Sequence, residues 1–182
     1  MIFLSAKAKK KLTKLFAFLI CAFVIAVIFD NAAKLVFPVK FKEYVHKYSE
    51  EYNLDPSLVF AIIKAESNFN PRAVSHKNAR GLMQISEITG RWGAERVGIE
   101  NYDPQMLFDP EVNIRIGCWY LGTLMKEYGG SVDLVLAAYN GGSGNVNRWL
   151  QDENYSRTGT SLDKIPFRET ERYVKRVKNN YM

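Results

Sequence analysis

The chain has 182 residues, with 25 Lys and Arg against 19 Asp and Glu, so its formal net charge is +6. Its 24% of charged and 47% of hydrophobic residues exclude a disordered polyelectrolyte and allow one ordinary domain with a sizeable core. Five lysines precede residue 15 and no acid precedes residue 30, which leaves 20 basic and 19 acidic groups in residues 30–182. Because that remainder is almost neutral, we expect no nucleic-acid partner.

The N-terminus has the pattern of a signal anchor. Residues 1–14 form a basic n-region that should stay cytoplasmic, and residues 15–29 form an uncharged apolar run, LFAFLICAFVIAVIF. As a helix the run spans roughly 22 Å, somewhat less than a hydrocarbon core of about 30 Å. No good small-x-small cleavage site follows it, so the sequence favours a retained transmembrane helix over a cleaved signal or a buried core helix. The prediction is a single-pass protein of the cell membrane with its domain on the extracytoplasmic side, or a secreted protein if the leader is cleaved.

Residues 30–40 are predicted to link this anchor to a globular domain that covers residues 41–182. Helix signals dominate the domain, and no convincing run of alternating strand residues occurs. Three Asp-Pro pairs, at Asp55, Asp103 and Asp109, each supply an N-cap acceptor followed by the residue best suited to the first helical position. The pattern predicts a mainly α fold, with helices at about 41–52, 56–67, 86–96, 104–108, 111–128, 132–139, 144–151 and 167–179.

One carboxylate continues an apolar helix face. Val59, Ile62 and Ile63 lie on one side of the helix predicted at 56–67, and Glu66 follows them on that side after seven, four and three residues. Burial raises the pKa of a carboxyl group, so such an acid keeps its proton near neutral pH, as a general acid must. The alternative is a glutamate that ends a helix and pairs with a nearby Arg or Lys.

Other isolated side chains give weaker signals. The tryptophans offer flat faces to pyranose rings or pack in the core; the sequence favours the core for Trp119 and leaves Trp92 and Trp149 undecided. His46 and His76 are isolated and are predicted at the surface. No metal-ligand spacing, phosphate-cradling glycine loop or Ser-His-Asp arrangement stands out, so neither a metal nor a cofactor is expected.

Four motifs occur in order along the domain. They are E-S-x-F-x-P from Glu66, G-L-M-Q from Gly81, A-Y-N from Ala138 and I-P-x-x-E-T-x-x-Y-V from Ile165. Together they resemble the catalytic domain of soluble lytic transglycosylases, part of the goose-type lysozyme-like group. The resemblance covers about residues 41–178 and implies a lysozyme-like fold for the domain that follows the N-terminal anchor.

The chain departs from the family's usual pattern at three loop positions. Asn78 stands where Gly is often found before G-L-M-Q, Glu87 where Pro often follows it, and Gly141 where Ala usually follows A-Y-N. Asn tolerates a left-handed backbone better than most residues, so the turn at position 78 can survive. These departures bear on substrate preference more than on activity.

The resemblance implies a peptidoglycan lytic transglycosylase that cuts the β-1,4 bond between N-acetylmuramic acid and N-acetylglucosamine. Glu66 matches the family's single catalytic acid, which protonates the glycosidic oxygen and then takes the proton of the muramic acid's own C6 hydroxyl, so that a 1,6-anhydro ring closes. This internal nucleophile removes the need for the second carboxylate of ordinary glycosidases. The matching substrate-binding positions are Ser67, Met83, Gln84, Tyr139, Asn140 and Glu169.

The implied partners are peptidoglycan glycan strands and, through the N-terminal helix, the membrane; the oligomeric state is left open, with a monomer as the expectation. Two alternative functions remain. One is a muramidase, which uses water as the nucleophile on the same bond. The other is a membrane-anchored peptidoglycan-binding or assembly protein without catalysis.

Overall fold

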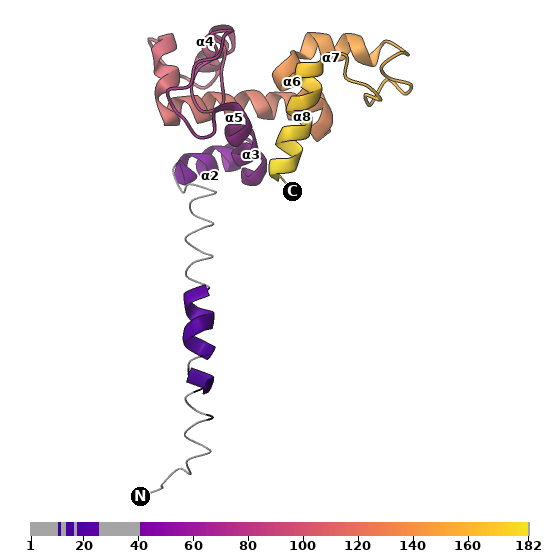
Figure 1. Cartoon of the computed structure of the whole chain (residues 1–182). Helices are drawn as coiled ribbons and strands as arrows, with labels where there is room; N and C mark the ends of the chain where they lie inside the picture. The colour runs from indigo at the N-terminus through magenta and orange to yellow at the C-terminus, as the bar shows by residue number, and fades with distance from the viewer. Residues whose placement is uncertain (1–10, 12–13, 17, 26–40, 182) are drawn as a thin grey trace, which may run out of the picture. The chain divides into compact units, whose positions relative to one another are not determined.

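The structure, a computed structural model, describes residues 11, 14–16, 18–25 and 41–181. The chain separates into two units, residues 1–40 and residues 41–182. In the first unit, residues 14–16 and 18–25 are helical (Figure 1). No helix in the described part of the chain is long and apolar enough to cross a membrane. Residues 17 and 26–29 of the expected anchor, the expected linker 30–40 and most of the basic n-region lie outside the described residues, so the anchor stays a prediction.

The second unit is made of helices joined by loops (Figure 1), and its described residues contain only isolated β-bridges. The helices are α2 (Lys42–Glu51), α3 (Pro56–Ser67), α4 (Glu87–Arg96), η1 (Pro104–Phe108), α5 (Pro110–Glu127), α6 (Val132–Gly141), α7 (Ser143–Leu150) and α8 (Arg168–Tyr181). Each predicted helix is therefore confirmed to within two residues at either end, and the short element η1 is a 3-10 helix.

The three Asp-Pro pairs begin helices as predicted. The carboxylates of Asp55, Asp103 and Asp109 each accept a hydrogen bond from a backbone N–H two or three residues further on, at 2.7–3.0 Å. Each bond satisfies a donor of the first turn that has no partner within its own helix. The proline that follows fits the first helical position because it has no N–H to satisfy.

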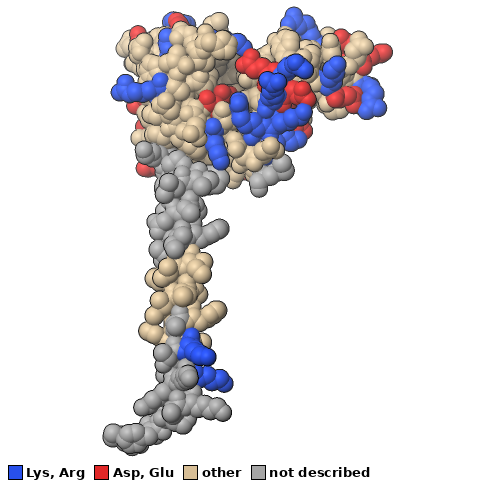
Figure 2. All heavy atoms as spheres, viewed as in Figure 1, with Lys and Arg blue, Asp and Glu red and all other residues tan. Residues whose placement is uncertain are grey.

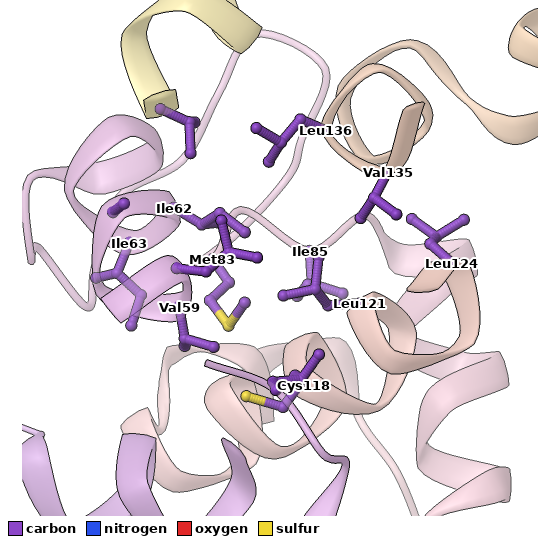
Figure 3. Close-up of a cluster of buried hydrophobic side chains, with 14 of the residues drawn as sticks. Val59, Ile62, Ile63, Met83, Ile85, Cys118, Leu121, Leu124, Val135 and Leu136 are labelled. Atoms are coloured by element: carbon purple, nitrogen blue, oxygen red, sulfur yellow. The ribbon is translucent and has the colours of Figure 1, made fainter. Parts of the chain in front are cut away.

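The core lies where α3, α5 and α6 meet the chain segment between α3 and α4 (Figure 3). In that segment Leu82, Met83 and Ile85 are almost fully buried, while Gln84 between them is not. Burying each apolar side chain contributes about 1.5–3 kcal/mol. The loop that carries the G-L-M-Q motif is therefore anchored by its own apolar side chains. Helix α8 packs against both α3 and α6.

A buried amide ties the same loop to α5. Asn113 is fully buried; its Oδ1 accepts a hydrogen bond from the backbone N–H of Met83 at 2.8 Å, and its Nδ2 donates to the carbonyls of Arg80 at 2.9 Å and Leu107 at 2.8 Å. Gly81 passes directly over this amide with φ of +77°, and a Cβ there would lie 2.2 Å from Asn113 Nδ2. The first glycine of G-L-M-Q is thus required both by its backbone conformation and by the lack of space.

Candidate active site

A cavity of about 400 Å³ is lined by residues from the end of α3, the loop before α4, the first turn of α4, α5, the end of α6 and the start of α8. Five of the seven predicted site residues line it, although they are far apart in the sequence: Glu66, Gln84, Tyr139, Asn140 and Glu169. The structure therefore brings together residues from all four motifs. Within the described residues, no group of three or more His, Cys, Asp or Glu side chains is placed to hold a metal ion.

Glu66 lies in the last turn of α3 and is largely withdrawn from solvent. Burial raises the pKa of its carboxyl group to about 7, and the negative charge of Glu169 adds to the rise. The hydroxyl of Tyr173 and the positive charge of Arg176 act in the opposite direction, and burial outweighs them. The carboxyl group is thus partly protonated at neutral pH, as a general acid requires, whereas an ion pair with Arg or Lys would have lowered its pKa.

Basic side chains gather over α8 (Figure 2), the helix that supplies Arg176. They are Arg168, Arg172, Lys175, Arg176 and Lys178. Two of them are matched by acids, since Lys175 lies 2.7 Å from Glu171 and Lys178 lies 2.7 Å from Asp133. Of these five, Arg176 is the one whose charge acts on the Glu66 pKa, and it lowers that pKa less than burial raises it.

Two tyrosines accompany Glu66, Tyr173 fully buried and Tyr139 partly buried. Burial raises the pKa of both Tyr139 and Tyr173 well above the usual range, so both hydroxyls stay neutral. The Tyr139 hydroxyl donates to the carbonyl of Met83 at 2.9 Å. The Tyr173 hydroxyl has no hydrogen bond of normal geometry among the described residues, yet it is close enough to Glu66 to stabilise the carboxylate form. Tyr173 was not among the predicted site residues, although it belongs to the fourth motif and stands one helical turn after Glu169, which places it on this side of α8.

The side-chain amides of Gln84 and Asn140 line the cavity, and each already forms a hydrogen bond within the protein through one of its two polar atoms. Asn140 Oδ1 accepts a hydrogen bond from the Thr170 hydroxyl at 2.9 Å, which orients the amide at the end of α6. Gln84 Nε2 donates to the carbonyls of Ala73 at 3.2 Å and Gly81 at 3.0 Å. Gln84 has φ of +49°, a left-handed conformation that turns it away from its buried neighbours.

Ser67 and Met83, the other two predicted substrate-binding residues, are not among those lining the cavity. The Ser67 hydroxyl lies 2.8 Å from the carbonyl of Leu82 and 3.1 Å from that of Ile63, and so joins α3 to the loop. The Met83 side chain is fully buried, and a Cβ on Gly117 of α5 would lie only 2.3 Å from its sulfur. Ser67 thus ties α3 to the G-L-M-Q loop and Met83 packs against α5, while contact of either residue with substrate stays a prediction.

Glu169 is exposed and forms an ion pair with Lys77 across the cavity, at 3.2 Å. This pair connects the loop before α4 with the first turn of α8. His76, predicted as an isolated surface residue, is exposed as expected but also lines the cavity, as do Ser75 and Lys77. Ser75, His76 and Lys77 were not among the predicted site residues, and the signal for them is their place a few residues before G-L-M-Q.

The tryptophans divide between the core and the surface. Trp149 is only 7% exposed, which assigns it to the core, and Trp119 packs partly buried against the core as predicted. Trp92 is 41% exposed. Asn78 has φ of +61°, which confirms that asparagine supplies the left-handed turn before G-L-M-Q.

The family model described as the transglycosylase SLT domain matches residues 43–160. The chain belongs to the transglycosylase SLT family. It is 36% identical over 168 residues to the membrane-bound lytic murein transglycosylase C of Sodalis glossinidius, a match that covers 77% of this chain and 45% of that protein. It is 35% identical over 143 residues to the soluble lytic murein transglycosylase of Escherichia coli K12, covering 78% of this chain and 22% of that protein. The chain therefore spans less than half the length of these curated relatives.

Solved transglycosylase structures share the fold of this SLT domain. The 70-kDa soluble lytic transglycosylase of Escherichia coli superposes with a TM-score of 0.71 at 32% identity, covering 81% of this chain and 24% of that one. An inactive glutamate-to-glutamine mutant of the Pseudomonas aeruginosa transglycosylase Slt superposes with a TM-score of 0.70 at 31% identity, with the same coverage. The prediction of a mainly α, lysozyme-like fold is thereby confirmed.

Proposed function

We propose that this SLT domain is a peptidoglycan lytic transglycosylase, which cleaves the β-1,4 bond between N-acetylmuramic acid and N-acetylglucosamine and forms 1,6-anhydromuramic acid. The observation that carries the proposal is Glu66, a largely buried acid with a pKa of about 7 in a cavity lined by hydrogen-bonding side chains. Two further findings support it: the curated relatives are named lytic murein transglycosylases, and the Pseudomonas aeruginosa relative is inactive as a glutamate-to-glutamine mutant.

In the proposed reaction one carboxyl group serves both steps. Protonated Glu66 gives its proton to the glycosidic oxygen as the bond to C1 breaks, which releases the N-acetylglucosamine side with a hydroxyl group. The resulting carboxylate then takes the proton of the C6 hydroxyl while that oxygen bonds to C1. Glu66 ends in its starting protonation state, and no water is consumed. The internal hydroxyl has a large advantage over water because it is already held beside C1.

The neutral tyrosines fit the same reaction. Because the Tyr139 hydroxyl proton is directed to the Met83 carbonyl, its oxygen lone pairs remain to stabilise positive charge that develops at C1. Tyr173 lies close enough to stabilise Glu66 after it has lost its proton. We propose that Gln84 and Asn140 orient the sugar and its acetamido group. Glu169 would contact the substrate once its ion pair with Lys77 opens.

The pH profile tests the assignment of the acid. Since the reaction starts from protonated Glu66, kcat/KM should be steady on the acidic side and fall by about tenfold per pH unit once the pH exceeds the carboxyl pKa of about 7. The measurement is the rate at which the protein releases soluble muropeptides from purified cell-wall sacculi between pH 5 and pH 9. Undiminished release at pH 9 would contradict the assignment of Glu66 as the general acid. No release at any pH would favour the non-catalytic alternative.

We also propose that residues 15–29 anchor the protein in the cell membrane, with the catalytic unit on the extracytoplasmic side where peptidoglycan lies. Support comes from the five lysines that precede the apolar run and from the relative named as membrane-bound. Another relative is named as soluble, so either arrangement is compatible with the family.

A further inference from the structure

Helix α4 exposes apolar surface that the proposed reaction does not use. Ile88 is 84% exposed and Trp92 is 41% exposed. Together with Glu87, Arg91 and Glu95 they form one open, solvent-exposed face of the helix. These five residues are called the α4 patch below. Large apolar side chains that stay exposed side by side point to a binding surface more often than isolated ones do.

The α4 patch adjoins the catalytic cavity. Ser86 and Thr89, at the start of the same helix, line that cavity. The Trp92 ring centroid lies 6.2 Å from that of Tyr120, which also lines the cavity. Trp92 further packs edge-on against Trp119, with ring centroids 4.6 Å apart, so its position at this edge is fixed by its neighbours. A chain-like ligand that leaves the cavity past Tyr120 and Thr89 would therefore reach the α4 patch next.

We propose that the α4 patch is a saccharide subsite for the outer sugars of the glycan strand whose scissile bond lies in the cavity. The inference rests on the proposed function and adds a second, distant point of contact to it. Trp92 offers an apolar ring surface to the C–H face of a pyranose, and Ile88 extends that surface. Glu87 and Glu95 offer carboxylate acceptors, and Arg91 offers donors, to the hydroxyl and amide groups around the sugar ring.

The composition of the α4 patch favours a sugar over other occupants. Its two acids and one base leave it slightly negative, which disfavours an anionic membrane surface. Glu87 and Arg91 form an ion pair at 3.3 Å in which both side chains stay exposed, so their polar groups are accessible to a sugar. The five residues of the α4 patch are far fewer than the roughly 20–30 residues that each partner contributes to a stable protein interface. An exposed face adjoining the cleavage site matches a continuing polymer better than a separate protein.

The test measures binding without turnover. In a Glu66→Gln background, the further substitutions Trp92→Ala, Trp92→Phe and Arg96→Ala are compared by calorimetry. The ligands are long, uncross-linked glycan strands and a tetrasaccharide of the same repeat. Trp92→Ala should weaken binding of the long strands by about tenfold, which is the size expected for one lost aromatic contact. Trp92→Phe should recover part of that loss. Arg96 is exposed on α4 outside the patch, so its replacement serves as the matched control.

The ratio between the two ligands decides the outcome. The proposal requires that Trp92→Ala affects the long strands several times more than the tetrasaccharide. An equal loss for both lengths would mean that Trp92 acts only by supporting Trp119 and Tyr120 in the cavity wall, and no loss for either would mean that the α4 patch binds no sugar; either result overturns the proposal. Failure of the catalytic assignment would be seen separately, as wild-type protein that binds strands but does not cut them.

Discussion

Replacing Glu66 with glutamine is expected to lower the rate of bond cleavage by about a thousandfold, the scale on which a positioned general acid acts. Glutamine keeps the size and hydrogen-bonding capacity of the side chain but has no proton to give to the glycosidic oxygen. It also cannot accept the proton of the C6 hydroxyl, so both steps fail at once. The measurement is the initial rate of muropeptide release from purified sacculi by wild type and variant at pH 6.

Folding should survive this substitution and become less dependent on pH. The folded-state pKa of about 7 lies above the unfolded value, so ionising Glu66 costs stability as the pH rises from about 4.5 through 7. At pH 8 the Glu66→Gln variant should therefore exceed the wild type in unfolding free energy by on the order of 3 kcal/mol, and the difference should vanish below pH 4.5. Glu50→Gln on the exposed side of α2 is the matched control, with unchanged cleavage expected. Cleavage by Glu66→Gln at more than a tenth of the wild-type rate would contradict the assignment.

Replacing Asn113 with alanine is expected to cost about 3–5 kcal/mol of unfolding free energy, because it removes a hydrogen bond from each of three backbone groups, although the Arg80 carbonyl retains one from the N–H of Ile85. These are the N–H of Met83 and the carbonyls of Arg80 and Leu107, each now held at 2.8–2.9 Å. A loss of this size is a large part of the 5–15 kcal/mol that stabilises a typical domain. Urea unfolding of wild type and variant, followed by circular dichroism, measures it.

The same variant should lose catalytic efficiency, since Asn113 holds the loop on which Gln84 stands. Asn179→Ala is the matched control, because Asn179 is exposed on α8, and its unfolding free energy should stay within about 0.5 kcal/mol of the wild type. A loss below about 1 kcal/mol in Asn113→Ala would show that water or a shifted side chain replaces the lost bonds. That result would contradict the role given to Asn113 in holding the loop.

Local signals predicted the helices well. Asp55, Asp103 and Asp109 supply caps that depend only on the next few residues, so their positions can be read from the chain itself. The burial of Glu66 was also predictable, because it continues a helix face whose other members are apolar. The resemblance to lytic transglycosylases added the remaining candidate residues, and five of the seven predicted site residues line one cavity.

The roles of loop residues were less predictable. In a helix or strand the regular repeat shows which side chains share a face, whereas in a loop side-chain direction depends on the individual backbone turns. Met83 and Gln84 are neighbours, yet the first is fully buried and the second lines the cavity, owing to a left-handed backbone at Gln84. Ser67 stays a predicted substrate contact, and its hydroxyl also bonds to the carbonyl of Leu82, a link that the sequence did not indicate. Asn113 acts through hydrogen bonds to backbone groups of Met83, Arg80 and Leu107, which lie outside its own helix. The residues around Asn113 in the sequence therefore give no sign of these contacts.

The chemistry at C1 separates the two enzymatic readings of this cavity. Glu169 is the second carboxylate among the described residues that line it, but it is exposed and paired with Lys77. A muramidase would use such a group to activate water, whereas the proposed transglycosylase uses the muramic acid's own hydroxyl. The most direct measurement is therefore the mass of the fragments that the wild-type protein releases from purified sacculi, with Glu66→Gln run in parallel. The account predicts anhydromuramic ends, one water lighter than reducing ends, from the wild type and almost no fragments from the variant. Reducing ends alone, or anhydromuramic ends from both proteins, would contradict it.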